Sequence, residues 1–233
     1  ITAGAAGQTT ITANDKNNDT ERIQNIRSML NETRISNSLW WYGWMGIYTA
    51  ASAGSFTAAC ISENDVTKIT QTVSGVESVI GLAGVILSPM PPAYAVNRLD
   101  GMPSSTPEER AKKLAASEDY LRETAQTQEF GRSWITHSLN FLVNASGGLV
   151  IWKGYDEKIE RAGGKPFKEG MLNFIMGFII GEIQIFTQPT GGIGQWKSYN
   201  EKYGIRDAEV ENDVALFAVP NGGGLLVVLT LKY

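Results

Sequence analysis

Three polar side chains recur at helical spacing inside one apolar stretch of the chain. His137, Asn140 and Asn144 are three and four residues apart, so they share one face of a helix. The chain has one histidine, and imidazole is the side chain that exchanges a proton near neutral pH. This row of polar side chains predicts either the lining of a polar path through the protein or a ligand site. The alternative is a polar contact that fixes the register of neighbouring helices.

Two carboxyl groups lie inside segments that are otherwise apolar. Glu77 interrupts residues 69–90, and Glu182 interrupts residues 171–188. A charged side chain in the hydrocarbon of a bilayer costs about 3 kcal/mol, so each group must be uncharged, paired or turned inward. Both are therefore candidates for a ligand site or path. For Glu77 the alternative is a contact between helices. For Glu182 the alternative is a purely structural pairing, for example with His137.

The composition argues against several other kinds of chemistry. A net charge of −4 without a basic run disfavours a nucleic-acid binder. One histidine and one cysteine, Cys60, are too few for the common zinc motifs or an internal disulfide. The glycine run at 191–194 follows an expected helix and not a strand, so it lacks the context of a phosphate-binding loop. We expect no metal and no cofactor, and an enzyme using Glu182 and His137 as acid and base is the least favoured hypothesis.

Four long apolar segments must position these residues. They are residues 39–61, 69–90, 133–152 and 171–188. Each approaches the roughly 17–25 residues that a helix needs to cross a bilayer. The sequence therefore predicts a mainly α fold with four transmembrane helices, arranged as two hairpins. The alternative is a soluble bundle whose four helices are buried, because apolar runs alone do not separate the two cases.

Tryptophans and small residues favour the membrane. All six tryptophans lie at or near the ends of the apolar segments, as in an interfacial aromatic belt. Small residues recur every four positions in the first and fourth segments, a spacing that lets helix backbones approach closely. The expected helix-packing residues are Gly46, Ala50, Gly54, Ala58, Gly177 and Gly181. They predict tightly packed helices and self-association.

The remaining sequence divides the chain around these segments. We expect an N-terminal segment with an amphipathic helix (1–38), a first helical hairpin (39–90), a polar connection with a long helix (91–132), a second helical hairpin (133–190) and a tail with a β-hairpin (191–233). Thr106 and Glu109 form a capping box that starts the long helix, which is expected to reach the third apolar segment. In the tail, two β-branched runs flank a Pro-Asn-Gly-Gly-Gly turn, which predicts the β-hairpin.

These features predict a membrane-embedded structural or assembly subunit of a cell-envelope complex. Its expected partners are the lipid bilayer and further copies of itself or other envelope proteins, which it would contact through the small-residue faces. The alternative function is a channel or transporter-like protein with a polar path lined by His137, Asn140, Asn144 and Glu182.

The two ends of the chain bear on its location. The opening residues are small and polar and do not start with Met, which is typical of a chain left after signal-peptide cleavage, so we expect export. The last strand, which ends at Tyr233, resembles the terminal strand of outer-membrane β-barrel proteins, but the chain lacks their repeated alternation. Apolar helices favour an inner membrane, so the sequence leaves the choice of membrane open.

Overall fold

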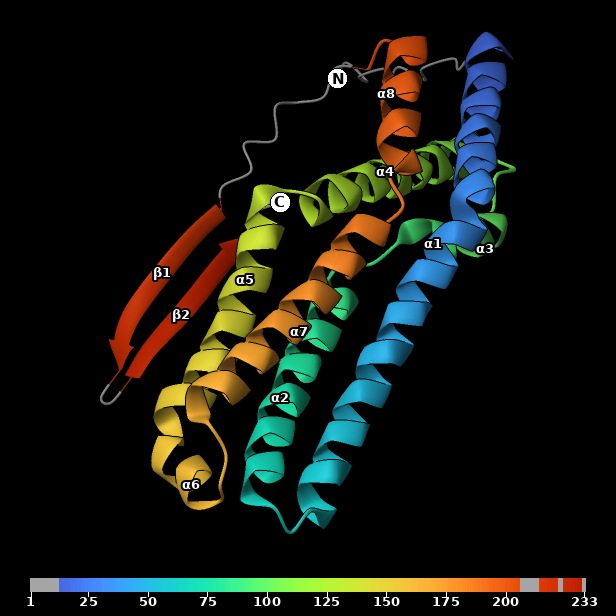
Figure 1. Ribbon diagram of the computed structural model, residues 1–233. Coiled ribbons are helices and arrows are strands. Elements are labelled where there is room, and N and C mark those ends of the chain that lie inside the picture. Colours follow the sequence, from blue (N-terminus) through green and yellow to red (C-terminus); the bar gives the residue numbers. More distant parts are fainter. Residues whose placement is uncertain (1–12, 206–213, 222–223, 232–233) are drawn as a thin grey trace, which may run out of the picture. The chain divides into compact units, whose positions relative to one another are not determined.

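The computed structural model describes residues 13–205, 214–221 and 224–231, with side chains for 18–205. The chain forms two compact units, residues 1–196 and 197–233. Every described element that lies wholly in the first unit is a helix (Figure 1). The opening residues, on which the prediction of export depends, lie outside the described part.

Four long helices run side by side in the first unit (Figure 1). They are α1 (Ala13–Ile61), α2 (Asp65–Leu87), α5 (Trp134–Leu149) and α7 (Pro166–Thr187). α1 packs mainly against α2, and α5 packs mainly against α7. α5 continues through a π-helical turn, η2 (Val150–Gly154), into the short α6 (Asp156–Arg161), where Ile69, Ile151 and Ile159 form a small apolar cluster. We call the part formed by α2, α5, α7 and residues 39–61 of α1 the bundle.

The prediction of four transmembrane helices is wrong. In the part of the chain that the structure describes, two helical stretches are long and apolar enough to cross a bilayer, Asp65–Leu87 and Pro166–Tyr203. α5 has only 16 residues, too few for a span of about 20. The apolar end of α1 is rich in Gly, Ala, Ser and Thr, which lowers its hydropathy, and it continues without a break from a polar half.

Helix boundaries follow the local capping signals. α4 (Pro107–Gly131) begins at the predicted capping box, in which Thr106 Oγ1 accepts from the Glu109 amide at 3.2 Å and Glu109 Oε2 accepts from the Thr106 amide at 3.0 Å. The expectation that this helix reaches the third apolar segment is wrong. It ends at Gly131, and Ser133 Oγ accepts from the Thr136 amide to start α5 as a separate helix.

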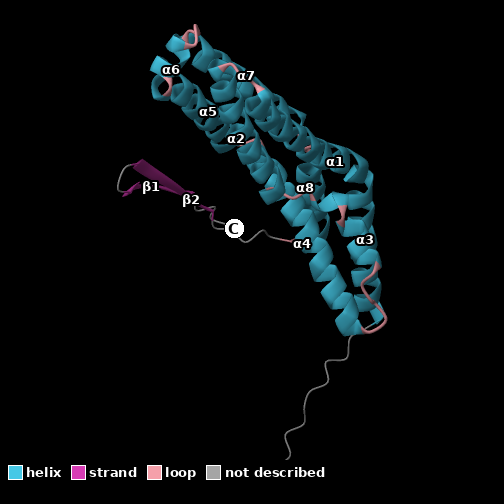
Figure 2. Cartoon of the chain, turned by 90° about the horizontal axis from the view of Figure 1, so that it is seen from below, coloured by secondary structure: helices cyan, strands magenta, loops and turns pink. Residues whose placement is uncertain are grey.

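An apolar core lies at one end of the bundle, where the polar half of α1 meets η1 (Pro91–Ala93), α3 (Ala95–Asp100) and α4. We call these elements, with residues 18–38 of α1, the cap. Its fully buried apolar side chains include Ile26, Leu30, Met90, Leu99 and Leu121. The cap and α6 lie at opposite ends of the bundle in both views (Figures 1 and 2).

Charged groups cover the surface of the cap. The Arg27 guanidinium lies 2.6 Å from Asp100 Oδ1 and lowers the pKa of that carboxyl group by hydrogen bonding. Arg22 pairs with Glu118. On α4, burial raises the pKa of Glu123. The cap therefore has the usual arrangement of a water-exposed domain, with apolar side chains inside and ion pairs outside.

The second unit holds the end of α8 (Gly191–Tyr203) and two strands, β1 (Val214–Asn221) and β2 (Gly224–Leu231). The strands pair antiparallel, with Val214 opposite Leu231 and Asn221 opposite Gly224. Within α8, the rings of Tyr199 and Tyr203 lie 4.8 Å apart.

Candidate functional site

In the bundle, polar and apolar side chains are placed the opposite way from those of the cap. Large apolar side chains are exposed on its outer surface, and they include Ile47, Val79, Leu142, Ile175, Ile179 and Ile183. Polar side chains lie between the helices instead, among them Glu77, Asn140, Asn144 and Asn173. Extended apolar surfaces of this kind are rare on soluble monomers and mark contact with lipid or protein.

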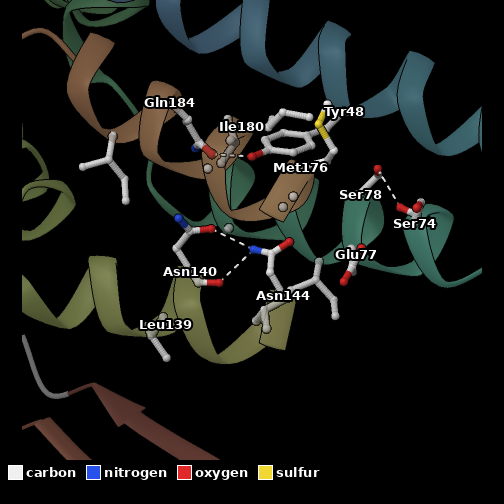
Figure 3. Close-up of a pocket in the computed structure, with 18 of the residues that line it drawn as sticks. Tyr48, Ser74, Glu77, Ser78, Leu139, Asn140, Asn144, Met176, Ile180 and Gln184 are labelled. Atoms are coloured by element: carbon white, nitrogen blue, oxygen red, sulfur yellow. Dashed lines mark hydrogen bonds between the residues drawn. The ribbon is translucent and has the colours of Figure 1, made fainter. Parts of the chain in front are cut away.

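The polar row predicted on the third apolar segment faces α7. His137 Nδ1 lies 2.8 Å from Glu182 Oε2, and Asn140 Nδ2 donates to Glu182 Oε1 at 2.9 Å. Asn144 Nδ2 donates to Asn140 Oδ1 and to the Asn140 carbonyl, both at 2.8 Å (Figure 3). The structure therefore joins His137, Asn140, Asn144 and Glu182 in one hydrogen-bonded chain, and the Glu182 carboxyl has two side-chain partners.

Glu77 does not join this chain. It lies on α2, where its Oε2 accepts from Asn173 Nδ2 at 3.0 Å, and the same amide nitrogen also donates to Ser74 Oγ at 3.0 Å. Sequence reasoning missed Asn173. One signal for it was available, because Asn173 lies four residues before Gly177 and eight before Gly181, on the same helical face.

Glycines make room for the interior polar groups. A Cβ on Gly177 would lie 1.9 Å from Asn144 Oδ1, and a Cβ on Gly181 would lie 2.0 Å from Asn140 Oδ1. No side chain fits at either position unless these amides move. Gly177 and Gly181 therefore pack directly against polar side chains of α5 within the same chain.

The small residues of α1 are placed differently. A Cβ on Gly46 or Gly54 would meet nothing within 4 Å, and Ala50 between them is exposed. Ala58 is half-buried. α1 instead contacts α2 through Phe56 and Tyr48, whose rings lie against glycines of α2. The contribution of the α1 small-residue face to self-association stays a prediction.

A cavity of about 630 Å³ runs through the bundle interior (Figure 3). Thr70 and Glu169 line it toward the α6 end of α2 and α7, and Ser88 and Gln188 line it toward the cap. Asn140 and Asn144 line its wall, whereas His137 and Glu182 are not among the lining residues. Two carboxyl groups, Glu77 and Glu169, are part of the described lining, which contains no Lys, Arg or His.

The described residues contain no group of three or more His, Cys, Asp or Glu side chains that could hold a metal ion. The polar groups of the cavity are amides, hydroxyls and carboxyls, which suit a polar solute, a proton or a monovalent cation. Comparison of the chain with protein-family models, curated proteins and solved structures finds no match.

Proposed function

We propose that the protein is a membrane-embedded helix bundle, and that the polar side chains along its interior cavity form a path for a small polar solute or ion. The supporting observation is the length of the cavity along the two candidate spans. It follows α2 from Thr70 to Ser88 and α7 from Glu169 to Gln188. At 1.5 Å per residue each stretch is about 28 Å long, close to the roughly 30 Å of bilayer hydrocarbon.

The polarity of the bundle supports the same proposal. In lipid, apolar side chains are stable on the outside and polar groups must turn toward the interior or toward water. Most of the large outward side chains of α2 and α7 are apolar, and those of α1 and α5 beside them include Ile47 and Leu142. In water the same surface would expose apolar area with no compensating burial.

Thiol accessibility tests this proposal with two neighbouring positions of α2. Ser78 lines the cavity, whereas Val79 points outward and is 46% exposed. We expect Ser78→Cys to react with a small, charged, water-soluble thiol reagent in liposomes, and Val79→Cys to stay unmodified because lipid covers it. Both variants are made with Cys60→Ser, which removes the exposed native thiol.

The order of the two rates decides the outcome. If Val79→Cys reacts faster than Ser78→Cys, water reaches the outer surface and the membrane proposal fails. If neither position reacts in liposomes while both react after denaturation, the helix is in lipid but the interior is dry, and the path fails. Ser78 and its cysteine replacement are nearly the same size, so the substitution itself disturbs the packing little.

A second candidate function is that of a self-associating structural subunit in a cell-envelope membrane. The observation that favours it is the exposed face of α1 formed by Gly46, Ala50 and Gly54, where Ala50 is exposed and a Cβ on either glycine would meet no described atom within 4 Å. Small residues on a lipid-facing helix allow a second helix to approach closely.

Gly54→Leu tests self-association. We expect it to weaken association between copies by about 1–3 kcal/mol, because the leucine side chain would separate the two helices. Analytical ultracentrifugation in mild detergent measures the change. Ala83→Leu is the control, since Ala83 is also small and exposed but lies on α2. A monomer before any substitution, or equal effects of the two leucines, argues against this contact.

A further inference from the structure

We propose that Glu77 and Asn173 form a proton-binding pair inside the cavity, in which Glu77 Oε1 carries a proton and donates it to Asn173 Oδ1. The pair already shares one hydrogen bond, from Asn173 Nδ2 to Glu77 Oε2 at 3.0 Å. A carboxylic acid and an amide can make two such bonds at once, because each offers one donor and one acceptor on the same edge. A carboxylate can make only the first.

Each residue of the pair has one buried side-chain oxygen that lacks a hydrogen-bond partner. Glu77 Oε1 and Asn173 Oδ1 are each buried without a hydrogen bond. Leaving one buried acceptor unpaired costs about 1–3 kcal/mol. A single proton between the two groups satisfies both atoms.

The space around the two oxygens favours a proton over a larger ligand. Both face Gly147 of α5, where a Cβ would lie 1.9 Å from Glu77 Oε1 and 3.1 Å from Asn173 Oδ1. A methyl group at that position would overlap Glu77 Oε1, so no larger ligand fits between the pair and Gly147. A proton needs no additional volume.

The surrounding charges supply no other partner. On α7 the nearest lining carboxyl group is Glu169, one helical turn from Asn173, and it is also acidic. Next to the pair, α5 contributes Gly147 and α2 contributes Ser74. α1 contributes Tyr48 to the cavity lining, and this side chain is neutral. His137 pairs with Glu182 and is not among the lining residues. Because the described cavity lining holds no cationic side chain, Glu77 would be an unpaired buried charge if it lost its proton.

The pair gives the proposed path a defined ligand, and this part of the inference rests on that function. When the proton leaves, the O–H bond of Glu77 breaks, the electron pair stays on the carboxylate and a water molecule in the cavity accepts the proton. The binding site itself requires only the geometry of the pair. If the thiol test fails, the proposed path is wrong, but the proton site is still tested separately by the spectroscopic experiment below.

Infrared difference spectroscopy of the full-length protein in lipid tests the inference. At pH 7 we expect the carbonyl stretch of a protonated carboxyl group, and we expect Glu77→Gln to abolish it. Glu182→Gln is the matched control and should leave the band, because it removes a carboxyl group between the helices that is not part of the pair. The band should also shift in deuterated water, since the proton can exchange through the cavity.

Stability gives a second readout. Glutamine at position 77 can donate to Asn173 Oδ1 and accept from Asn173 Nδ2, so Glu77→Gln should retain the unfolding midpoint of the native protein at pH 7. Absence of the band at pH 7, or a band that persists in Glu77→Gln, overturns the proposal. A band that disappears when Na⁺ is added overturns the assignment of a proton as the bound charge.

Discussion

Replacing Gly170 with alanine is expected to destabilise the bundle by about 3 kcal/mol, at the upper end of ordinary overpacking effects. α5 and α7 cross here with their backbones in direct contact. A Cβ on Gly170 would lie 2.4 Å from the Gly148 carbonyl oxygen and 3.1 Å from the Trp152 Cβ. The clash is with backbone and not with the end of a flexible side chain, so the two helices must move apart. Thermal unfolding in detergent, followed by tryptophan fluorescence, measures the loss.

Gly84→Ala is the control for this prediction. Gly84 lies in the interior of α2, and a Cβ there would meet nothing within 4 Å. Because alanine has the higher helix propensity, this change should leave stability unchanged or raise it by up to about 1 kcal/mol. Equal unfolding midpoints for the two alanine variants would show that α5 and α7 are not in backbone contact at this point.

Replacing Gln128 with leucine is expected to cost about 2–5 kcal/mol of unfolding free energy. Gln128 is fully buried, its Nε2 donates to Asn37 Oδ1 at 3.1 Å, and its Oε1 accepts from the Gly192 amide at 2.8 Å. It therefore links α4 both to α1 and to the start of α8. Leucine has a similar volume but leaves two buried polar groups without partners, each at a cost of about 1–3 kcal/mol.

Gln126→Leu and a double variant show whether the loss of stability comes from the two Gln128 hydrogen bonds or simply from replacing a polar side chain with an apolar one. Gln126 is on the same helix but only half-buried, so its replacement should change the unfolding free energy by less than about 1 kcal/mol. Asn37→Leu combined with Gln128→Leu should cost less than the sum of the single changes, because the double variant removes both members of one bond. Additive losses would contradict the link between α1 and α4.

Several features of the site could be read from the sequence because they are local. The spacing of His137, Asn140 and Asn144 places them on one helical face whatever the helix packs against. Glu182 lies in an apolar segment, which predicts that it needs a partner. The structure places these four residues in one hydrogen-bonded chain. The Glu77–Asn173 pair could not be read in the same way, because it depends on how α2 and α7 are rotated toward each other.

The number of spanning helices shows where sequence patterns were insufficient. An uncharged run of about 20 residues predicts a span, but the third apolar segment is divided between α5 and η2. The first is the end of a 49-residue helix whose other half packs in the cap. Charge-free length measures only composition, whereas crossing a bilayer also requires an unbroken helix of sufficient hydropathy.

The sequence by itself determined where helices begin and which residues share a face. Thr106 with Glu109 and the serine at position 133 fix two helix starts through hydrogen bonds to amides only a few residues away. Tertiary structure alone decided which small residues meet a neighbour. Gly177 and Gly46 belong to similar stripes, yet one receives the Asn144 side chain and the other faces outward. The physical reason is that helical periodicity fixes angles around one axis, while contacts depend on the rotation and height of a second helix, which distant residues set.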